Sequence, residues 1–154
     1  MYRNYEHTQF GTLIVTVFAV FFALMAVFWV GTREPLAFPA SLLAFLVIVA
    51  LLSGWLTIRI DGERLRWRFG IGLIGGSAQV AEIADAQMVR NPWWYGWGMH
   101  LTSRGWVYNV SGLDAIEVKL AGGRTFRLGT DEPQKLLDAI HEAQSAKGVS
   151  LKLG

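Results

Sequence analysis

Two long apolar runs, Phe10–Val30 and Leu36–Leu56, stand near the start of this chain of 154 residues. Each run has 21 residues and no charged side chain. A helix of that length is about 31 Å long, which matches the hydrocarbon thickness of a bilayer. We therefore expect a transmembrane helical hairpin over residues 10–56, after an N-terminal tail over residues 1–9.

A cleaved signal peptide is the alternative interpretation of the first run. That run is longer than the hydrophobic region of a signal peptide, and only Arg3 precedes it as a fixed positive charge. The residues after it, Gly31–Glu34, make a poor cleavage site, and the second run follows at once. These features favour a retained anchor.

The distribution of arginine predicts the orientation of the hairpin. The loop between the runs holds Arg33, offset by Glu34, and Arg3 lies in the tail. Four more arginines follow the second run closely: Arg59, Arg64, Arg66 and Arg68. Because basic residues concentrate on the cytoplasmic side, we expect both termini and the soluble domain in the cytoplasm.

After the runs, residues 57–60 and 64–69 alternate apolar and polar side chains, which is typical of half-buried strands. Asp61-Gly62 between them predicts a hairpin turn. A turn of two or four residues would keep the apolar faces matched, and it would place Arg59 opposite Arg64 or Arg66.

Arginines that face each other across two strands repel, so this face needs a negative partner. Three interpretations are open. The face is solvated or neutralised by the domain's own Glu82, Asp85 or Glu117; it contacts anionic lipid; or it contacts an acidic protein. The candidate contact residues are Arg59, Arg64, Arg66 and Arg68.

A second hairpin is predicted near the end of the chain. A three-residue turn over Ala121–Gly123 pairs Val118 with Phe126 and sets Glu117 opposite Arg127. A helix capped by Thr130 or Asp131 should follow and end near Gly148. Its apolar stripe comprises Leu136, Leu137, Ile140 and Ala143.

The segment Asn91–Gly98 is the densest aromatic feature, with Trp93, Trp94, Tyr95 and Trp97. One interpretation places these rings in the core, at least two of them plugging the open end of a sandwich. The other lets them project as membrane-interface anchors or as a patch for a protein partner. A small-molecule pocket is disfavoured, because few polar groups converge there.

The sequence contains few candidate catalytic or metal-binding groups. With no cysteine, disulfides and thiolate zinc sites are excluded, and none of the three histidines stands at metal-ligand spacing from another ligand. The serines lack a nucleophile-elbow context, and a net charge of +2 is too small for a nucleic-acid binder. We expect no catalytic, cofactor-binding or metal-binding residue, no enzyme activity and no nucleic-acid or small-molecule partner.

Four segments resemble bacterial pleckstrin-homology-like (PH-like) domains that follow two N-terminal membrane helices. These segments are Leu65–Gly70, Asn91–Gly98, Gly105–Gly112 and Leu128–Pro133. The resemblance implies a bent antiparallel seven-stranded sandwich or barrel over residues 57–147, capped by the C-terminal helix, with a tail over residues 148–154. It also implies a bacterial inner (plasma) membrane. Eukaryotic members bind phosphoinositides through a basic first hairpin turn, whereas Asp61-Gly62-Glu63 is acidic here, so no such residue carries over.

These features together predict a non-enzymatic membrane protein that presents a PH-like interaction module for protein assembly or scaffolding. Its expected partners are membrane lipids and either a second copy or another membrane protein. The alternatives are a sensor of anionic lipid or membrane state and an accessory subunit of a transporter or channel.

Overall fold

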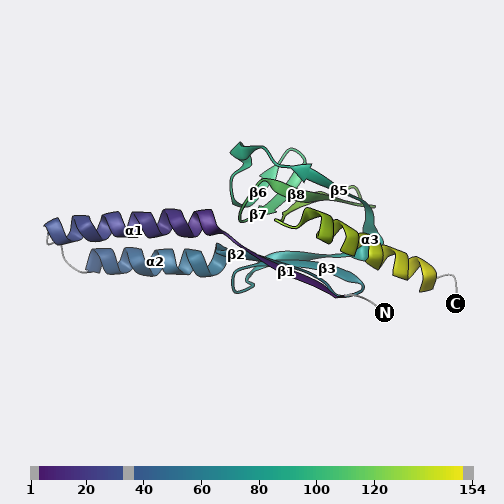
Figure 1. Cartoon of the computed structure of the whole chain (residues 1–154), viewed down its shortest axis with the longest axis horizontal. Coiled ribbons are helices and arrows are strands. Elements are labelled where there is room, and N and C mark those ends of the chain that lie inside the picture. Colours follow the sequence, from purple (N-terminus) through teal and green to yellow (C-terminus); the bar gives the residue numbers. More distant parts are fainter. Residues whose placement is uncertain (1–3, 33–36, 151–154) are drawn as a thin grey trace.

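Two apolar helices leave one end of a two-sheet domain side by side, as Figure 1 shows. The computed structural model describes residues 4–32 and 37–150, in which α1 spans Thr12–Thr32 and α2 spans Ala37–Ser53. Over Val15–Thr32, α1 is long and apolar enough to cross a membrane, and none of that window is buried in the protein. The apolar part of α2, Pro39–Ser53, is shorter. The loop expected between the runs, with Arg33 and Glu34, lies outside the described residues.

The second apolar run was predicted to continue to Leu56, and this boundary is wrong. The helix ends at Ser53, and Trp55 opens the strand β2, Trp55–Ile60. Apolar residues at the start of a buried strand extend the apolar composition of the helix, so composition alone gives no boundary between them.

The expected N-terminal tail contains a strand, β1, which spans Tyr5–Phe10. It pairs antiparallel with β2 from Tyr5 opposite Ile60 to Phe10 opposite Trp55. The N–H of Gly11 continues this ladder by donating to the carbonyl of Gly54 at 2.8 Å. The two apolar helices are therefore inserted into a β-hairpin, at the place where its turn would be.

The first sheet continues from β2 to β3, Arg64–Phe69, and β4, Ile74–Gln79, in the order β1-β2-β3-β4. Ile60 lies opposite Leu65, so the apolar faces match as predicted. Arg59 lies opposite Arg66, which is one of the two registers that the sequence left open.

The second sheet has the order β5-β8-β9-β7-β6. These strands span Ile83–Arg90, Asp114–Leu120, Thr125–Gly129, Gly105–Asn109 and Gly98–Thr102, respectively. Short 3-10 turns, η1 at Val80–Glu82 and η2 at Trp93–Tyr95, precede β5 and β6. The described residues thus form nine strands rather than the expected seven, partly because β1 comes from the expected tail. The sheet is mixed rather than antiparallel, because β7 and β9 run parallel.

The predicted hairpin of β8 and β9 is confirmed in register. Val118 pairs with Phe126, and Glu117 pairs with Arg127. The N–H of Leu120 donates to the carbonyl of Arg124 at 2.8 Å and closes the three-residue turn. Alternation and the turn composition were sufficient here because both constraints require the same register.

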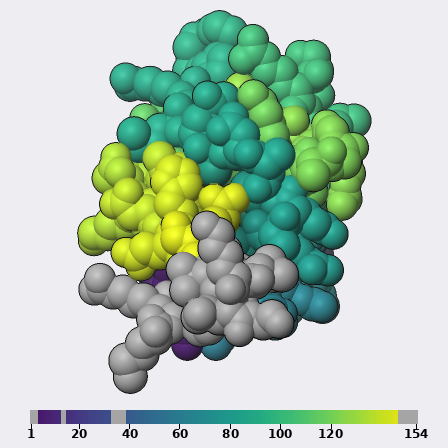
Figure 2. Space-filling view, turned by 90° about the vertical axis from the view of Figure 1, so that its right-hand side faces the viewer, coloured from purple at the N-terminus to yellow at the C-terminus, as the bar shows by residue number. Residues whose placement is uncertain are grey.

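The C-terminal helix α3 spans Pro133–Ser150, slightly beyond the predicted end. Leu136, Ile140 and Ala143 of the predicted stripe are buried against the core. Neither predicted cap takes the N-cap position, because the carbonyl of Glu132 accepts the first helical hydrogen bond, from the N–H of Leu136. Seen from the end opposite α1 and α2, α3 (yellow) lies against teal and green parts of the chain (Figure 2).

The ends of the two sheets are aligned by hydrogen bonds. We call the end that carries α1 and α2 the proximal end; there, Nε2 of Gln9 donates to the carbonyl of Ser111 at 3.2 Å. At the opposite, distal end, the N–H of Val80 donates to the carbonyl of Glu63, and the N–H of Ala121 donates to the carbonyl of Glu82. Because strand directions alternate, the turns 70–73 and 91–97 belong to the proximal end, and the turns at 61–63, 103–104 and 121–124 to the distal end.

The inserted helices should be dispensable for folding of the sheets. We expect that replacing residues 12–53 with Asn-Gly, which favours a two-residue hairpin turn between Gly11 and Gly54, gives a detergent-free domain that unfolds cooperatively on heating. Circular dichroism measures this. As a matched control, the same variant without residues 4–10 loses β1 and should unfold at a lower temperature. An excised domain without cooperative unfolding would show that the sheets need the helices, and equal unfolding temperatures of the two variants would contradict a stabilising β1–β2 pairing.

Candidate interaction site

The arginine face of the first sheet is neutralised in part by carboxylates of the same sheet. Nη1 of Arg59 lies 3.7 Å from Oε2 of Glu6, and Nε of Arg66 lies 3.4 Å from Oδ2 of Asp61. These carboxylates differ from the predicted ones. Asp85 and Glu117 instead face the basic residues of their own sheet, Lys119 at 3.6 Å and Arg127 at 2.7 Å. Within residues 4–32 and 37–150, Arg64 and Arg68 have no carboxylate within ion-pair distance.

The four predicted arginines lie together around one surface hollow of about 530 Å³. Small residues of β4, Gly75, Gly76 and Ser77, form part of its lining. Its lining comprises Thr57, Arg59, Arg64, Arg66, Trp67, Arg68, Gly72, Leu73, Gly75, Gly76 and Ser77. The structure therefore brings the four arginines together. The aromatic segment, which lies between β5 and β6, does not line this hollow.

A buried ion pair ties the aromatic segment to the outer face of the second sheet. Nη2 and Nε of Arg127 lie 2.7 and 2.8 Å from Oε2 of Glu117. Nη1 of Arg127 donates to Oδ1 of Asn91 at 3.0 Å, and the guanidinium lies 6.0 Å from the ring centre of Tyr95. Arg127 thus connects two strands to the start of the aromatic segment, which fixes where that segment leaves the sheet.

The same contacts determine the ionisation of Glu117. Burial of this carboxyl opposes its charge, but hydrogen bonds from Arg127 and Gln87 and the positive charges of Arg127 and Lys119 outweigh burial and lower its pKa. The carboxylate is therefore the favoured form of Glu117 under the aromatic segment.

The tryptophans of the aromatic segment lie outside the core, so the interpretation that at least two of its rings plug the sandwich is wrong. Trp93 is 74% exposed, Trp94 is 68% exposed and Trp97 is 40% exposed. Trp93 and Trp94 pack edge to face, with ring centres 6.0 Å apart. The segment crosses the polar outer face of the sheet, whereas the core is filled from the inner face.

An apolar surface that the sequence did not predict lies on the inner face of the second sheet. One row of paired residues runs from Val118 through Phe126 and Trp106 to Leu101. Exposure along this row rises from 0% at Val118 and 7% at Phe126 to 42% at Trp106 and 67% at Leu101. Met99, on the same face as Leu101, is 45% exposed. We call Met99, Leu101 and Trp106 the open inner face.

A hollow of about 430 Å³ adjoins the open inner face between β4 and β7. Trp67, stacked on Phe126 with ring centres 4.5 Å apart, forms part of its wall, together with Tyr108 and Trp106. On another side of the sandwich, α3 contacts β2, β5 and β8. Trp106 and Tyr108 alternate along β7 and share one face of it, but no sequence pattern shows that the facing sheet stops before it covers β6.

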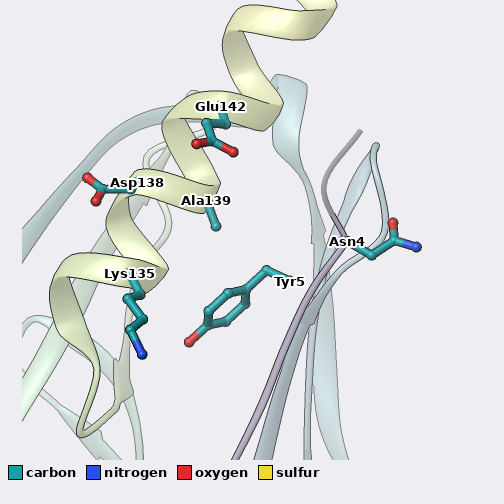
Figure 3. A pocket seen from close by; sticks show the side chains of 6 residues that line it. All are labelled: Asn4, Tyr5, Lys135, Asp138, Ala139 and Glu142. Atoms are coloured by element: carbon teal, nitrogen blue, oxygen red, sulfur yellow. The ribbon is translucent and has the colours of Figure 1, made fainter. Parts of the chain in front are cut away.

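A third hollow, of about 340 Å³, lies between β1 and α3. In Figure 3 the ring of Tyr5 points from the strand toward the helix, between Lys135 and Ala139. Burial and the negative charge of Glu132 raise the pKa of Tyr5 to about 12, so its phenol stays protonated at neutral pH. Nε2 of His7 lies 2.6 Å from Oδ1 of Asp131 nearby. These contacts join the first strand to the start of the last helix.

The described residues hold no group of three or more His, Asp or Glu side chains that could bind a metal ion. The geometry instead offers three surfaces for contact: the arginine face, the exposed tryptophans and the open inner face. Comparison of the chain with models of protein families, with curated proteins and with solved structures finds no match.

The buried pair should be more important for stability than the exposed pairs. Arg127→Met leaves Glu117 buried without its partner, so we expect a loss of about 3–5 kcal/mol in the free energy of unfolding, measured by denaturant titration of the excised domain. Lys119→Met, which removes the exposed pair with Asp85, is the matched control and should cost at most about 1 kcal/mol. Equal losses would contradict this assignment.

The same pair predicts an acid dependence. Because folding lowers the pKa of Glu117, its stabilising contribution is present above the ordinary pKa of a glutamate and is lost as the pH falls through the lowered value. The free energy of unfolding should therefore fall less steeply with acidification in Glu117→Gln than in the wild type. Parallel pH profiles would show that Glu117 is not the responsible group.

Proposed function

We propose that this chain is a membrane-anchored, non-enzymatic interaction module that holds its β domain at the cytoplasmic surface of a bacterial inner membrane. There it binds a second copy or another membrane protein. The observation that carries the proposal is the rise in exposure along the inner face, which leaves Leu101 and Trp106 uncovered at the edge of the domain. The PH-like class is part of this proposal, and the two packed sheets with a C-terminal helix support it.

The topology supports an anchor that crosses the membrane twice. Because β1 and β2 are neighbours in one sheet, α1 must begin and α2 must end on the same side of any membrane. The helices then cross it twice or not at all. Cleavage after α1 would also remove β1 from the chain that forms the domain, which argues against a signal peptide. At about 1.5 Å per residue, the 17 residues of α2 extend about 26 Å, close to the hydrocarbon thickness.

The open inner face supports a protein as the partner. Large exposed apolar patches on soluble domains mark interaction sites, and Met99, Leu101 and Trp106 continue the apolar surface of the core. The strand β6 also lies at the edge of its sheet, with one side unpaired in the described structure. A partner that packs apolar side chains on this face would complete the layer that the first sheet leaves unfinished.

Substitution of the open inner face should strongly weaken partner binding. In full-length protein with a photocrosslinking residue in place of Met99, we expect discrete adducts in membranes, identified by mass spectrometry. Leu101→Asp should reduce their yield about tenfold or more, because burying a leucine contributes about 1.5–3 kcal/mol.

The matched control is Ser103→Asp, which places the same charge in the neighbouring exposed turn and should leave the adducts unchanged. An adduct with the chain itself would identify a homo-oligomer, and an adduct with another protein would identify a separate partner. If no adduct forms and the purified protein is a monomer, the interaction module is refuted.

A second candidate function is recognition of anionic lipid, which the unpaired state of Arg64 and Arg68 among the described residues favours. We expect the excised domain to bind vesicles that contain anionic lipid. Arg68→Gln, which removes the unpaired arginine nearest the proximal end, should weaken binding by about 1 kcal/mol. The control is Arg124→Gln, in the distal turn of β8 and β9, and flotation measures binding. Binding that is independent of salt would contradict this function, because salt screens exposed charges.

A further inference from the structure

The turn between β3 and β4, Gly70–Leu73, sits directly on the last residues of α2. The N–H of Ile71 donates to the carbonyl of Leu51 at 3.0 Å, and the N–H of Gly70 donates to the carbonyl of Trp55 at 2.8 Å. Gly70 has a φ of +46°, and a Cβ there would lie 1.8 Å from the Leu51 carbonyl oxygen. Glycine is therefore required, because the backbone of the turn touches the helix.

These contacts fix the position of the turn along the axis of α2. Leu51 lies inside the apolar helix, two residues before its end at Ser53. The turn consequently reaches past the end of α2 and lies beside its final turn. Any bilayer that covers the apolar part of α2 must come close to this segment.

The side chains of the turn are apolar and uncovered. Ile71 is 59% exposed and Leu73 is 76% exposed. In water this exposure is unfavourable, because apolar surface stays in contact with the solvent. If these two side chains lie in lipid, this explains both why the turn lies beside the end of α2 and why its side chains are uncovered.

A basic side chain stands immediately beside the turn. A Cβ at Gly72 would lie 3.4 Å from Cδ of Arg68, so the arginine stem runs along the turn. Arg68 has no ion-pair partner within the described residues. Arginine commonly places its stem against apolar surface and its guanidinium among polar groups, which suits a position at the level of the lipid phosphates.

We propose that Gly70–Leu73 is a membrane-inserted wedge, which places Ile71 and Leu73 in the leaflet nearest the domain. This inference rests on the proposed spanning hairpin. The bilayer is the assigned occupant because the wedge is continuous with the exposed apolar surface of α2. With the wedge inserted, the domain contacts the membrane at a point outside the helices, and this contact restricts its rotation about the hairpin.

Site-directed spin labelling of the full-length protein tests the wedge. Because the sequence has no cysteine, single-cysteine variants carry one nitroxide each. We would label Leu73→Cys and, independently, Ile71→Cys in nanodiscs. Val20→Cys in α1 is the lipid control, and Glu63→Cys in a distal turn is the water control. Collision rates with oxygen, which concentrates in lipid, and with a water-soluble nickel chelate give the environment of each label.

We expect a several-fold higher oxygen-to-nickel ratio at positions 71 and 73 than at position 63, and a still higher ratio at position 20, which lies near the middle of α1. If positions 71 and 73 match position 63 while position 20 is in lipid, the wedge is refuted and the anchor is retained. If position 20 itself is accessible to nickel, the proposed anchor fails. Labels at 71 and 73 that are shielded from both reagents would indicate a protein contact, such as a second copy, and would also overturn the wedge.

Discussion

The pairing of β1 with β2 is the constraint on which the rest of the structure depends. It brings together residues that are separated by both apolar helices, with Phe10 directly opposite Trp55. A loop of that length carries a closure cost, but this cost grows only slowly with length, and helices that pack side by side already bring their ends together. The domain and the hairpin are therefore one unit, with two points of attachment instead of one.

This double attachment explains why the proximal end is crowded with contacts. Gly54 and Gly70 are both glycines that backbone approaches require: a Cβ would lie 2.4 Å from the Ala50 oxygen at the first and 1.8 Å from the Leu51 oxygen at the second. Gln9, just before α1, is bonded to the second sheet through Ser111. The helices, both sheets and their turns are held in one arrangement there, and the distal end is joined separately through η1.

The sequence was most informative where three independent signals agreed. For β8 and β9, alternation, charge complementarity and a glycine turn all required one register, and the structure has it. β1 was missed because Tyr5–Phe10 has little apolar alternation, and its strand conformation depends on the partner across the hairpin. The mixed sheet was missed for a similar reason, since the parallel contact of β7 with β9 is non-local.

For the candidate site, the four arginines were correctly grouped. For the tryptophans the sequence left a core position and an exposed position open, because ring size alone does not decide between them; the buried Arg127–Glu117 pair places their segment on the outer face.

The position of the helices between two paired strands also bears on how the chain is made. A ribosome completes β1 well before β2 exists, and a helical hairpin emerges between them. For a chain that enters the membrane as proposed, β1 can pair with β2 only after both helices have crossed the membrane. The chain has then returned to the side on which β1 lies. A chain in which one helix fails to insert would leave its two strands on opposite sides of the bilayer. Completion of the first sheet would thus require that both helices have inserted correctly.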